Sequence, residues 1–325
     1  MKRRDFITLL GGATAAWPLG ARAQQAAMPV VGFLSAGSLD GWEPMMAGFQ
    51  LGLKDMGYVA GQNVAIEYHW MEGRLDRAPA MVAELIRHQV AVIFANTPGN
   101  LAAKAATTTI PIVFTTGGDP VQMGLVASLS RPGGNVTGVT QMNAEVSPKR
   151  LALVHELLPT ATTIAILVNP ASPIAEPQVR ELQTAARALG VQLHVLHAST
   201  ERDFDTVFAS LTQMRAGPLV ISADSFFNSR SKLLAELTLR HAVPAIYEDR
   251  AFAVAGGLMT YGGRTPDIYR IAGAYTGRIL KGERPADLPV QQGTRVELII
   301  NMKTAKALGL SIPLPLLGRA DEVIE

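Results

Sequence analysis

The 325-residue sequence contains no cysteine. This absence excludes disulfide bonds, thiolate metal ligands, a cysteine nucleophile and a lipid-modified N-terminal cysteine. No two glycines are separated by a single residue, so the Gly-x-Gly-x-x-Gly dinucleotide motif is missing, and the Gly-x4-Gly-Lys-Ser/Thr phosphate loop is missing as well. The Gly-x-Ser-x-Gly elbow of hydrolases and the His-Glu-x-x-His zinc motif are also absent. We therefore predict neither a cofactor nor a metal site.

The first 23 residues have the three-part pattern of a secretory leader. Residues 1–4 are basic, residues 6–16 form an apolar run, and Ala-Arg-Ala at 21–23 is a small-x-small cleavage site. The apolar run is about half the roughly 20 residues that a membrane-spanning helix needs, so an anchor is not expected. Residues 3–7, Arg-Arg-Asp-Phe-Ile, fit a twin-arginine export signal, with a Sec-type leader as the alternative. We predict a periplasmic protein, cleaved after Ala23.

The charge balance changes when this leader is removed. The chain has 29 Lys and Arg against 27 Asp and Glu, and the leader holds four of these cations and one acid. The mature chain is therefore close to neutral, with a net charge of −1. A near-neutral chain has no basic surface for nucleic acid or for an anionic membrane, and we predict neither as a partner.

Short apolar segments alternate with amphipathic segments along most of the chain, which predicts strands alternating with helices. Short strands that are apolar on both sides are typical of a parallel sheet covered by helices on both faces. The pattern begins again after residue 140, where Ser147 and Pro148 predict a helix start. We predict an α/β protein of two doubly wound parallel-sheet lobes. The main predicted strands are residues 30–34, 63–70, 91–95, 112–114, 136–140, 164–168, 191–196, 219–222, 245–247, 258–261 and 296–300.

Small polar residues follow the predicted strands in both halves. Ligands of open parallel sheets bind beyond the carboxyl ends of the strands, where helix N-termini suit a carboxylate and Asp side chains suit an ammonium group. The alternative for each residue is an ordinary turn or helix cap. The candidate ligand-binding residues are Ser35, Gly37, Thr97, Thr116 and Asp119 in the first half and Asn169, Ser222, Asp224, Tyr247 and Tyr261 in the second, with the two tyrosines as stacking surfaces.

Several segments resemble the periplasmic substrate-binding proteins of ABC transporters, in the branch typified by tryptophan- and tyrosine-binding members. They are Thr-Gly-Gly-Asp-Pro-Val at 116–121, Leu-Val-Ala-Ser-Leu at 125–129, Arg-Pro-Gly-Gly-Asn-Val-Thr-Gly-Val at 131–139, residues 279–285 and the tail at 319–325. The resemblance implies a type I clamshell with three hinge crossings, near Thr140, Tyr261 and Pro289. The expected lobes are residues 24–140 with 262–288, and residues 141–261 with 289–325.

The resemblance also implies a function. A monomer would capture a small ligand between its lobes and deliver it to a membrane permease driven by an ATPase. The expected ligand is an amino acid or a related small carboxylate, with an aromatic amino acid as one hypothesis. Two alternatives stay open. One is an exported α/β enzyme, which a pair of carboxylates in the cleft would favour, and the other is a ligand-sensing partner of a membrane signalling protein.

Overall fold

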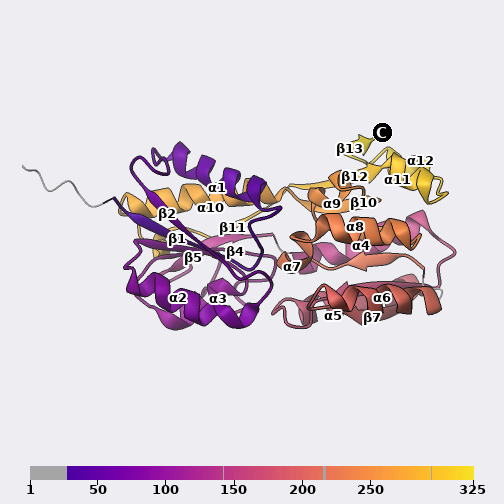
Figure 1. The fold of residues 1–325 in the computed structure, drawn as a ribbon, viewed down its shortest axis with the longest axis horizontal. Helices are drawn as coiled ribbons and strands as arrows, with labels where there is room; N and C mark the ends of the chain where they lie inside the picture. The colour runs from indigo at the N-terminus through magenta and orange to yellow at the C-terminus, as the bar shows by residue number, and fades with distance from the viewer. Residues whose placement is uncertain (1–27, 142, 215–216, 294) are drawn as a thin grey trace, which may run out of the picture.

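The computed structural model describes residues 28–325 apart from 142, 215, 216 and 294. The predicted leader, residues 1–23, lies outside the described residues. The described chain forms two α/β lobes, each with helices on both faces of a mostly parallel sheet (Figure 1). The predicted fold class is therefore confirmed. In the described part of the chain, no helix has both the length and the apolar character needed to cross a bilayer.

The first lobe has a sheet of order β11-β5-β4-β3-β1-β2, in which all neighbouring strands run parallel. Its strands are β1 (Val30–Ser35), β2 (Ala65–Trp70), β3 (Val92–Asn96), β4 (Ile112–Thr116), β5 (Val136–Thr140) and β11 (Gln291–Gln292). Helices α1 (Glu43–Asp55) and α10 (Thr265–Leu280) pack on one face, and α2 (Ala78–Arg87) and α3 (Gly99–Ala106) on the other. The central strands are buried on both faces, which explains their unbroken apolar sequences.

The second lobe has a sheet of order β13-β12-β10-β9-β8-β6-β7, parallel except between β10 and β12. Its strands are β6 (Thr163–Val168), β7 (Gln192–His197), β8 (Leu219–Ile221), β9 (Ala245–Tyr247), β10 (Met259–Gly263), β12 (Val296–Asn301) and β13 (Glu322–Ile324). One face carries α4 (Asn143–Leu157), α5 (Ala175–Leu189), α11 (Met302–Ala307) and α12 (Leu314–Leu317). The other face carries α6 (Arg202–Gln213), α7 (Ser225–Asn228), α8 (Ser231–Arg240) and α9 (Arg250–Val254).

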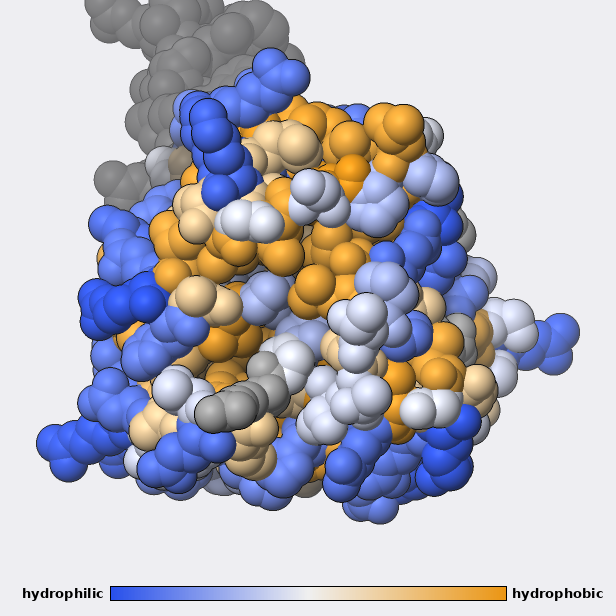
Figure 2. Space-filling model, turned by 90° about the vertical axis from the view of Figure 1, so that its right-hand side faces the viewer, coloured by the Kyte–Doolittle hydropathy of each residue, from blue (hydrophilic) through white to orange (hydrophobic). Residues whose placement is uncertain are grey.

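Hydrophobic residues also reach the surface at the far end of the second lobe. Figure 2 shows them gathered between hydrophilic residues on this end of the molecule. Helix α12 lies at this end (Figure 1), and its Leu314 is 81% exposed.

The chain passes between the two sheets three times. It leaves the first sheet after β5, returns between β10 and α10, and leaves again between β11 and β12. The third passage therefore follows Gln292, later than the expected crossing near Pro289, because Gln291 and Gln292 pair with Val139 and Thr140 of β5. The second passage lies near Arg264 instead of Tyr261, which is still paired within the second sheet.

Two glycines allow α10 to pack closely against α1, although the two helices are far apart in the sequence. A Cβ atom on Gly52 would lie 1.9 Å from the carbonyl oxygen of Arg270, and one on Gly273 would lie 2.0 Å from that of Phe49. Both distances are far below van der Waals contact, so no larger residue fits at these positions without moving a helix. The return of α10 to the first lobe therefore depends on glycine in both helices.

Candidate functional site

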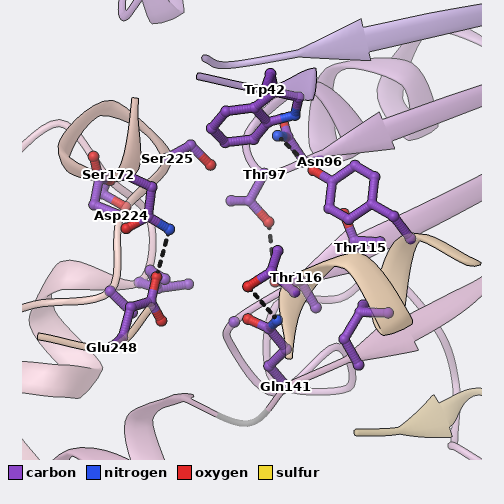
Figure 3. A pocket seen from close by; sticks show the side chains of 17 residues that line it. Trp42, Asn96, Thr97, Thr115, Thr116, Gln141, Ser172, Asp224, Ser225 and Glu248 are labelled. Carbon is purple, nitrogen blue, oxygen red and sulfur yellow. Dashed lines mark hydrogen bonds between the residues drawn. The ribbon is translucent and has the colours of Figure 1, made fainter. Parts of the chain in front are cut away.

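A polar cavity lies between the two lobes, where the carboxyl ends of both sheets face each other (Figure 3). The cavity has a volume of about 60 Å³. The first lobe lines the cavity with Trp42, Asn96, Thr97, Thr115, Thr116, Gly117, Ile268 and Tyr269, the second lobe with Ser172, Ile174, Ala223, Asp224, Ser225, Asn228 and Glu248, and the connecting segments with Gln141 and Thr265.

Hydroxyl and amide groups form the first-lobe wall. Asn96, at the end of β3, donates from Nδ2 to Ser35 Oγ at 3.1 Å and to the Tyr269 hydroxyl at 3.2 Å, and its Oδ1 accepts from the Ala36 N–H at 2.8 Å. The Thr97 hydroxyl donates to Thr116 Oγ1 at 2.9 Å. Adjacent parallel strands bring these groups together, so this wall is neutral and rigidly hydrogen-bonded.

Carboxyl groups dominate the second-lobe wall. Asp224 caps α7 by accepting from the Phe226 N–H at 2.9 Å, and burial raises the pKa of its carboxyl group. Glu248, directly after β9, accepts from Asn228 Nδ2 at 2.7 Å. Burial raises the pKa of Glu248 to about 7, against the opposing attraction of Arg150 in the core of the same lobe. Burial destabilises the ionised form of both carboxyl groups, and a cationic ligand group would stabilise it.

No Lys or Arg is found among the described residues that line this cavity. Within the same described ranges, no three His, Cys, Asp or Glu side chains are placed to hold a metal ion. The charge of the lining is therefore negative at a pH where Glu248 is ionised, and it comes from one wall. A zwitterionic or cationic guest fits this charge better than an anion does.

The two lobes also touch around the cavity. The Arg230 guanidinium, paired with Glu201 in the second lobe, donates from Nη1 to Ser38 Oγ of the first lobe at 3.2 Å. Phe226 packs against the first-lobe Gly73, where an added Cβ would lie 3.1 Å from its ring. Between the lobes, Gln141 Nε2 donates to Thr265 Oγ1 at 3.3 Å, and that hydroxyl donates to Asp249 at 2.5 Å. The contacts show a closed arrangement of the lobes.

Five of the ten candidate residues lie in or directly behind the cavity. Thr97, Thr116 and Asp224 line it. Ser35 supports Asn96, and Asn169 donates to Asp224 Oδ1 at 3.3 Å. These five residues come from both lobes, which matches the expectation of a shared cleft.

The other five candidates lie away from the cavity lining. Tyr247 is fully buried in the second-lobe core, where its ring stacks on Phe252 and its hydroxyl bonds Thr238 Oγ1 at 2.6 Å. Ser222 is buried without lining the cavity, and Tyr261 packs against the apolar core of the second lobe. Asp119 caps the turn that follows it. Gly37 lets the Trp42 ring approach, since an added Cβ would lie 2.9 Å from that ring.

Glu248 is the main cavity residue that the sequence did not single out. It directly follows Tyr247 at the end of β9, and successive side chains of a strand point to opposite sides. Because Tyr247 points into the core, Glu248 points to the opposite side of the strand, where it lines the cavity. The sequence therefore did contain an indication of Glu248 as a cavity residue, namely a charged residue directly after an aromatic residue at the end of an apolar strand.

Comparisons with known proteins give the family. The model of the family described as ABC transporter substrate binding protein matches residues 29–324. A tyrosine-binding protein of Clostridioides difficile (strain R20291) is 28% identical over 264 residues, which are 81% of this chain and 76% of the relative.

Solved structures agree with this match. A conserved domain protein from Vibrio cholerae is 26% identical with a TM-score of 0.84, over 91% of this chain and 99% of that one. An ABC domain from Streptococcus pneumonia, solved in complex with L-Trp, is 25% identical with a TM-score of 0.83 over the same shares of the two chains. The resemblance found in the sequence is therefore confirmed. The chain belongs to the ABC transporter substrate-binding proteins and has their type I periplasmic binding fold.

Proposed function

We propose that this protein is the solute receptor of an ABC importer and that it holds an amino acid or a related small carboxylate between its lobes. The observation that carries the proposal is the polar cavity lined by both lobes at the carboxyl ends of their sheets. The relatives named for tyrosine and solved with L-Trp support the amino-acid class. In this role the protein acts as a periplasmic monomer, with a membrane permease and its ATPase as partners.

The acidic second-lobe wall and the neutral, hydroxyl-rich first-lobe wall suit the two ends of an amino acid. The ammonium group would face Glu248 and Asp224, where it makes charge-assisted hydrogen bonds and stabilises both buried carboxylates. The carboxylate would face hydroxyl donors of the first-lobe wall such as Thr97 and Thr115, because hydroxyl protons rotate toward an acceptor. A ligand held in this way bridges the lobes and therefore favours the closed form.

A carboxylate pair in the cleft was the feature that would favour an enzyme. Asp224 and Glu248 do line one cavity, but both belong to the second-lobe wall (Figure 3). Paired catalytic carboxylates of glycosidases instead flank the reacting bond from two sides. Two acids on one wall fit the recognition of one cationic group, and the family binds substrates.

A thermal-shift panel of the mature protein tests this function. At 100 times its dissociation constant, a specific ligand stabilises the folded state by about 2.7 kcal/mol. We expect at least one amino acid to raise the melting temperature by roughly 5 °C, while the same compound lacking its ammonium group has no effect. A clear shift with a neutral sugar and none with any amino acid would contradict the proposed ligand class.

Ligand affinity should depend on pH through Glu248. A ligand ammonium group stabilises the carboxylate form, so binding lowers the pKa of Glu248 and releases a proton near pH 7. Affinity should therefore increase as the pH rises through 7, by about tenfold between pH 6 and pH 8. Titration calorimetry in buffers of different ionisation enthalpy measures both the affinity and the released proton. A pH-independent affinity would argue against an ammonium group at Glu248.

A further inference from the structure

One hydrogen bond joins the two lobes on the side away from the segments that connect them. Arg230, directly before α8 of the second lobe, donates from Nη1 to Ser38 Oγ of the first lobe at 3.2 Å. Among the residues that the structure describes, it is the one hydrogen bond between side chains that joins the lobes outside the connecting segments. We call this side of the cleft its mouth.

Ser38 lies far from the connecting segments. It follows β1, and strands β3 and β4 separate β1 from β5, which leads into the first of these segments. Neighbouring strands are about 4.8 Å apart, so β1 lies roughly 14 Å from β5 across the sheet. At that distance from a hinge, a rotation of about 5° moves a group by roughly 1 Å, which is enough to break a hydrogen bond of this length. The bond therefore forms only when the lobes are closed.

Arg230 is held in place by its own lobe. Its Nε pairs with Glu201, and its Nη1 also donates to Ser229 Oγ at 2.9 Å. Its guanidinium carbon lies over the Phe226 ring, 5.5 Å from the centroid, in the arrangement of a cation–π contact. Because all these partners belong to the second lobe, the guanidinium group keeps its position when the lobes separate. Forming the bond to Ser38 therefore costs little further side-chain entropy.

The first lobe offers matching groups at the mouth. The Ser38 hydroxyl donates to the Asp40 carbonyl oxygen at 3.4 Å, so a lone pair of the same oxygen is free to accept from Arg230. Beside this bond, the Phe226 ring packs on Gly73, which follows the edge strand β2. An added Cβ on Gly73 would lie 3.1 Å from that ring, so the lobes are in close contact here.

We propose that Arg230 is a latch that holds the lobes closed at the mouth by binding Ser38, whether or not the cavity holds a ligand. Arg230 does not line the cavity, so it acts as a positioning residue for closure. A protein that already favours its closed form binds a ligand more tightly, because less of the binding free energy is used for closing. The inference does not depend on the ligand class, and its failure would leave the proposed function standing.

Pulsed electron paramagnetic resonance on the ligand-free mature protein tests the proposal. Because the chain has no cysteine, spin labels can be placed at Asp76→Cys in the first lobe and Glu176→Cys in the second, whose native side chains are 73% and 82% exposed. We expect the wild-type protein to show a population at the closed distance. Arg230→Ala should lower the ratio of closed to open molecules about tenfold, as expected for a hydrogen bond to a charged group. Ser38→Ala removes the acceptor without changing the second lobe, and it should lower the ratio by a similar factor.

Arg319→Ala is the matched control, because Arg319 is also a second-lobe arginine in an ion pair, with Glu156, but lies away from the mouth. Its ratio should stay at the wild-type value. The double variant Arg230→Ala with Ser38→Ala should be no more open than Arg230→Ala alone, because both changes remove the same bond. Effects that add in the double variant would show that Arg230 acts only within its own lobe, and would overturn the latch. An unchanged ratio in both single variants, or a wild-type protein without a closed population, would overturn it as well.

Discussion

Replacing Glu248 by Gln is expected to weaken amino-acid binding about 100-fold at pH 8. Gln keeps the size of the side chain and an oxygen for the hydrogen bond from Asn228, but it removes the negative charge that faces the ligand. Losing one partner of a buried, hydrogen-bonded charge pair costs about 2–5 kcal/mol of binding free energy, and 100-fold is about 2.7 kcal/mol. Titration calorimetry with the best amino acid of the thermal-shift panel measures the change.

Two further variants make this result interpretable. Glu176→Gln removes a carboxylate from the same lobe at a position where its side chain is 82% exposed, and it should leave affinity unchanged. Because Arg150 is buried in that lobe, circular dichroism should confirm that the Glu248 variant is folded before its affinity is compared. Asp224→Asn should weaken the same ligand by a similar factor. Normal affinity in both folded acid variants would exclude them as the ammonium site.

Replacing Gly52 by Val should give the largest loss of stability. The new Cβ would begin 1.9 Å from the carbonyl oxygen of Arg270, so α1 and α10 must move apart and lose part of their shared core. Overpacking of this kind costs about 3 kcal/mol, which for a lobe of this size lowers the melting temperature by roughly 6–12 °C. Differential scanning calorimetry measures the shift.

Leu51→Val is the matched control on the same helix. Leu51 is 44% exposed, and the substitution also introduces a β-branched residue into α1. It should cost only about 0.5 kcal/mol, the difference in helix propensity. Equal losses in the two variants would show that β-branching, and not the contact with α10, limits stability at this helix.

The strands could be predicted because parallel strands buried on both faces require continuous apolar segments. Residues 30–34 were expected as a strand, and β1 covers Val30–Ser35. Strand β11 could not be predicted, since Gln291 and Gln292 carry no apolar pattern and their pairing is set by the fold around them. The helix expected to start at Ser147 begins at Asn143, and Pro148 lies inside it. Pro148 is the sixth residue of α4 and lies beyond its first turn, so the Ser-Pro pair does not mark the start of this helix.

The site could be predicted by region more easily than by residue. Parallel sheets bring the ends of their strands to one edge, so Thr97, Thr116 and Asp224 could be expected there. The orientation of a strand determines which residue near its end faces the cavity. At the end of β9, Tyr247 points into the core and Glu248 lines the cavity. Ile174 could not be found from sequence at all, because its position depends on how the second lobe meets Gly118.

The order of segments along the chain has a consequence for biosynthesis. Helix α10 and strand β11 complete the first lobe, yet both follow strands β6 to β10 of the second lobe in the sequence. While the ribosome is still making the second lobe, the first sheet lacks an edge strand and the helix that covers α1, and its apolar face stays open to water. The nascent first half should therefore need a chaperone until residue 292 has emerged.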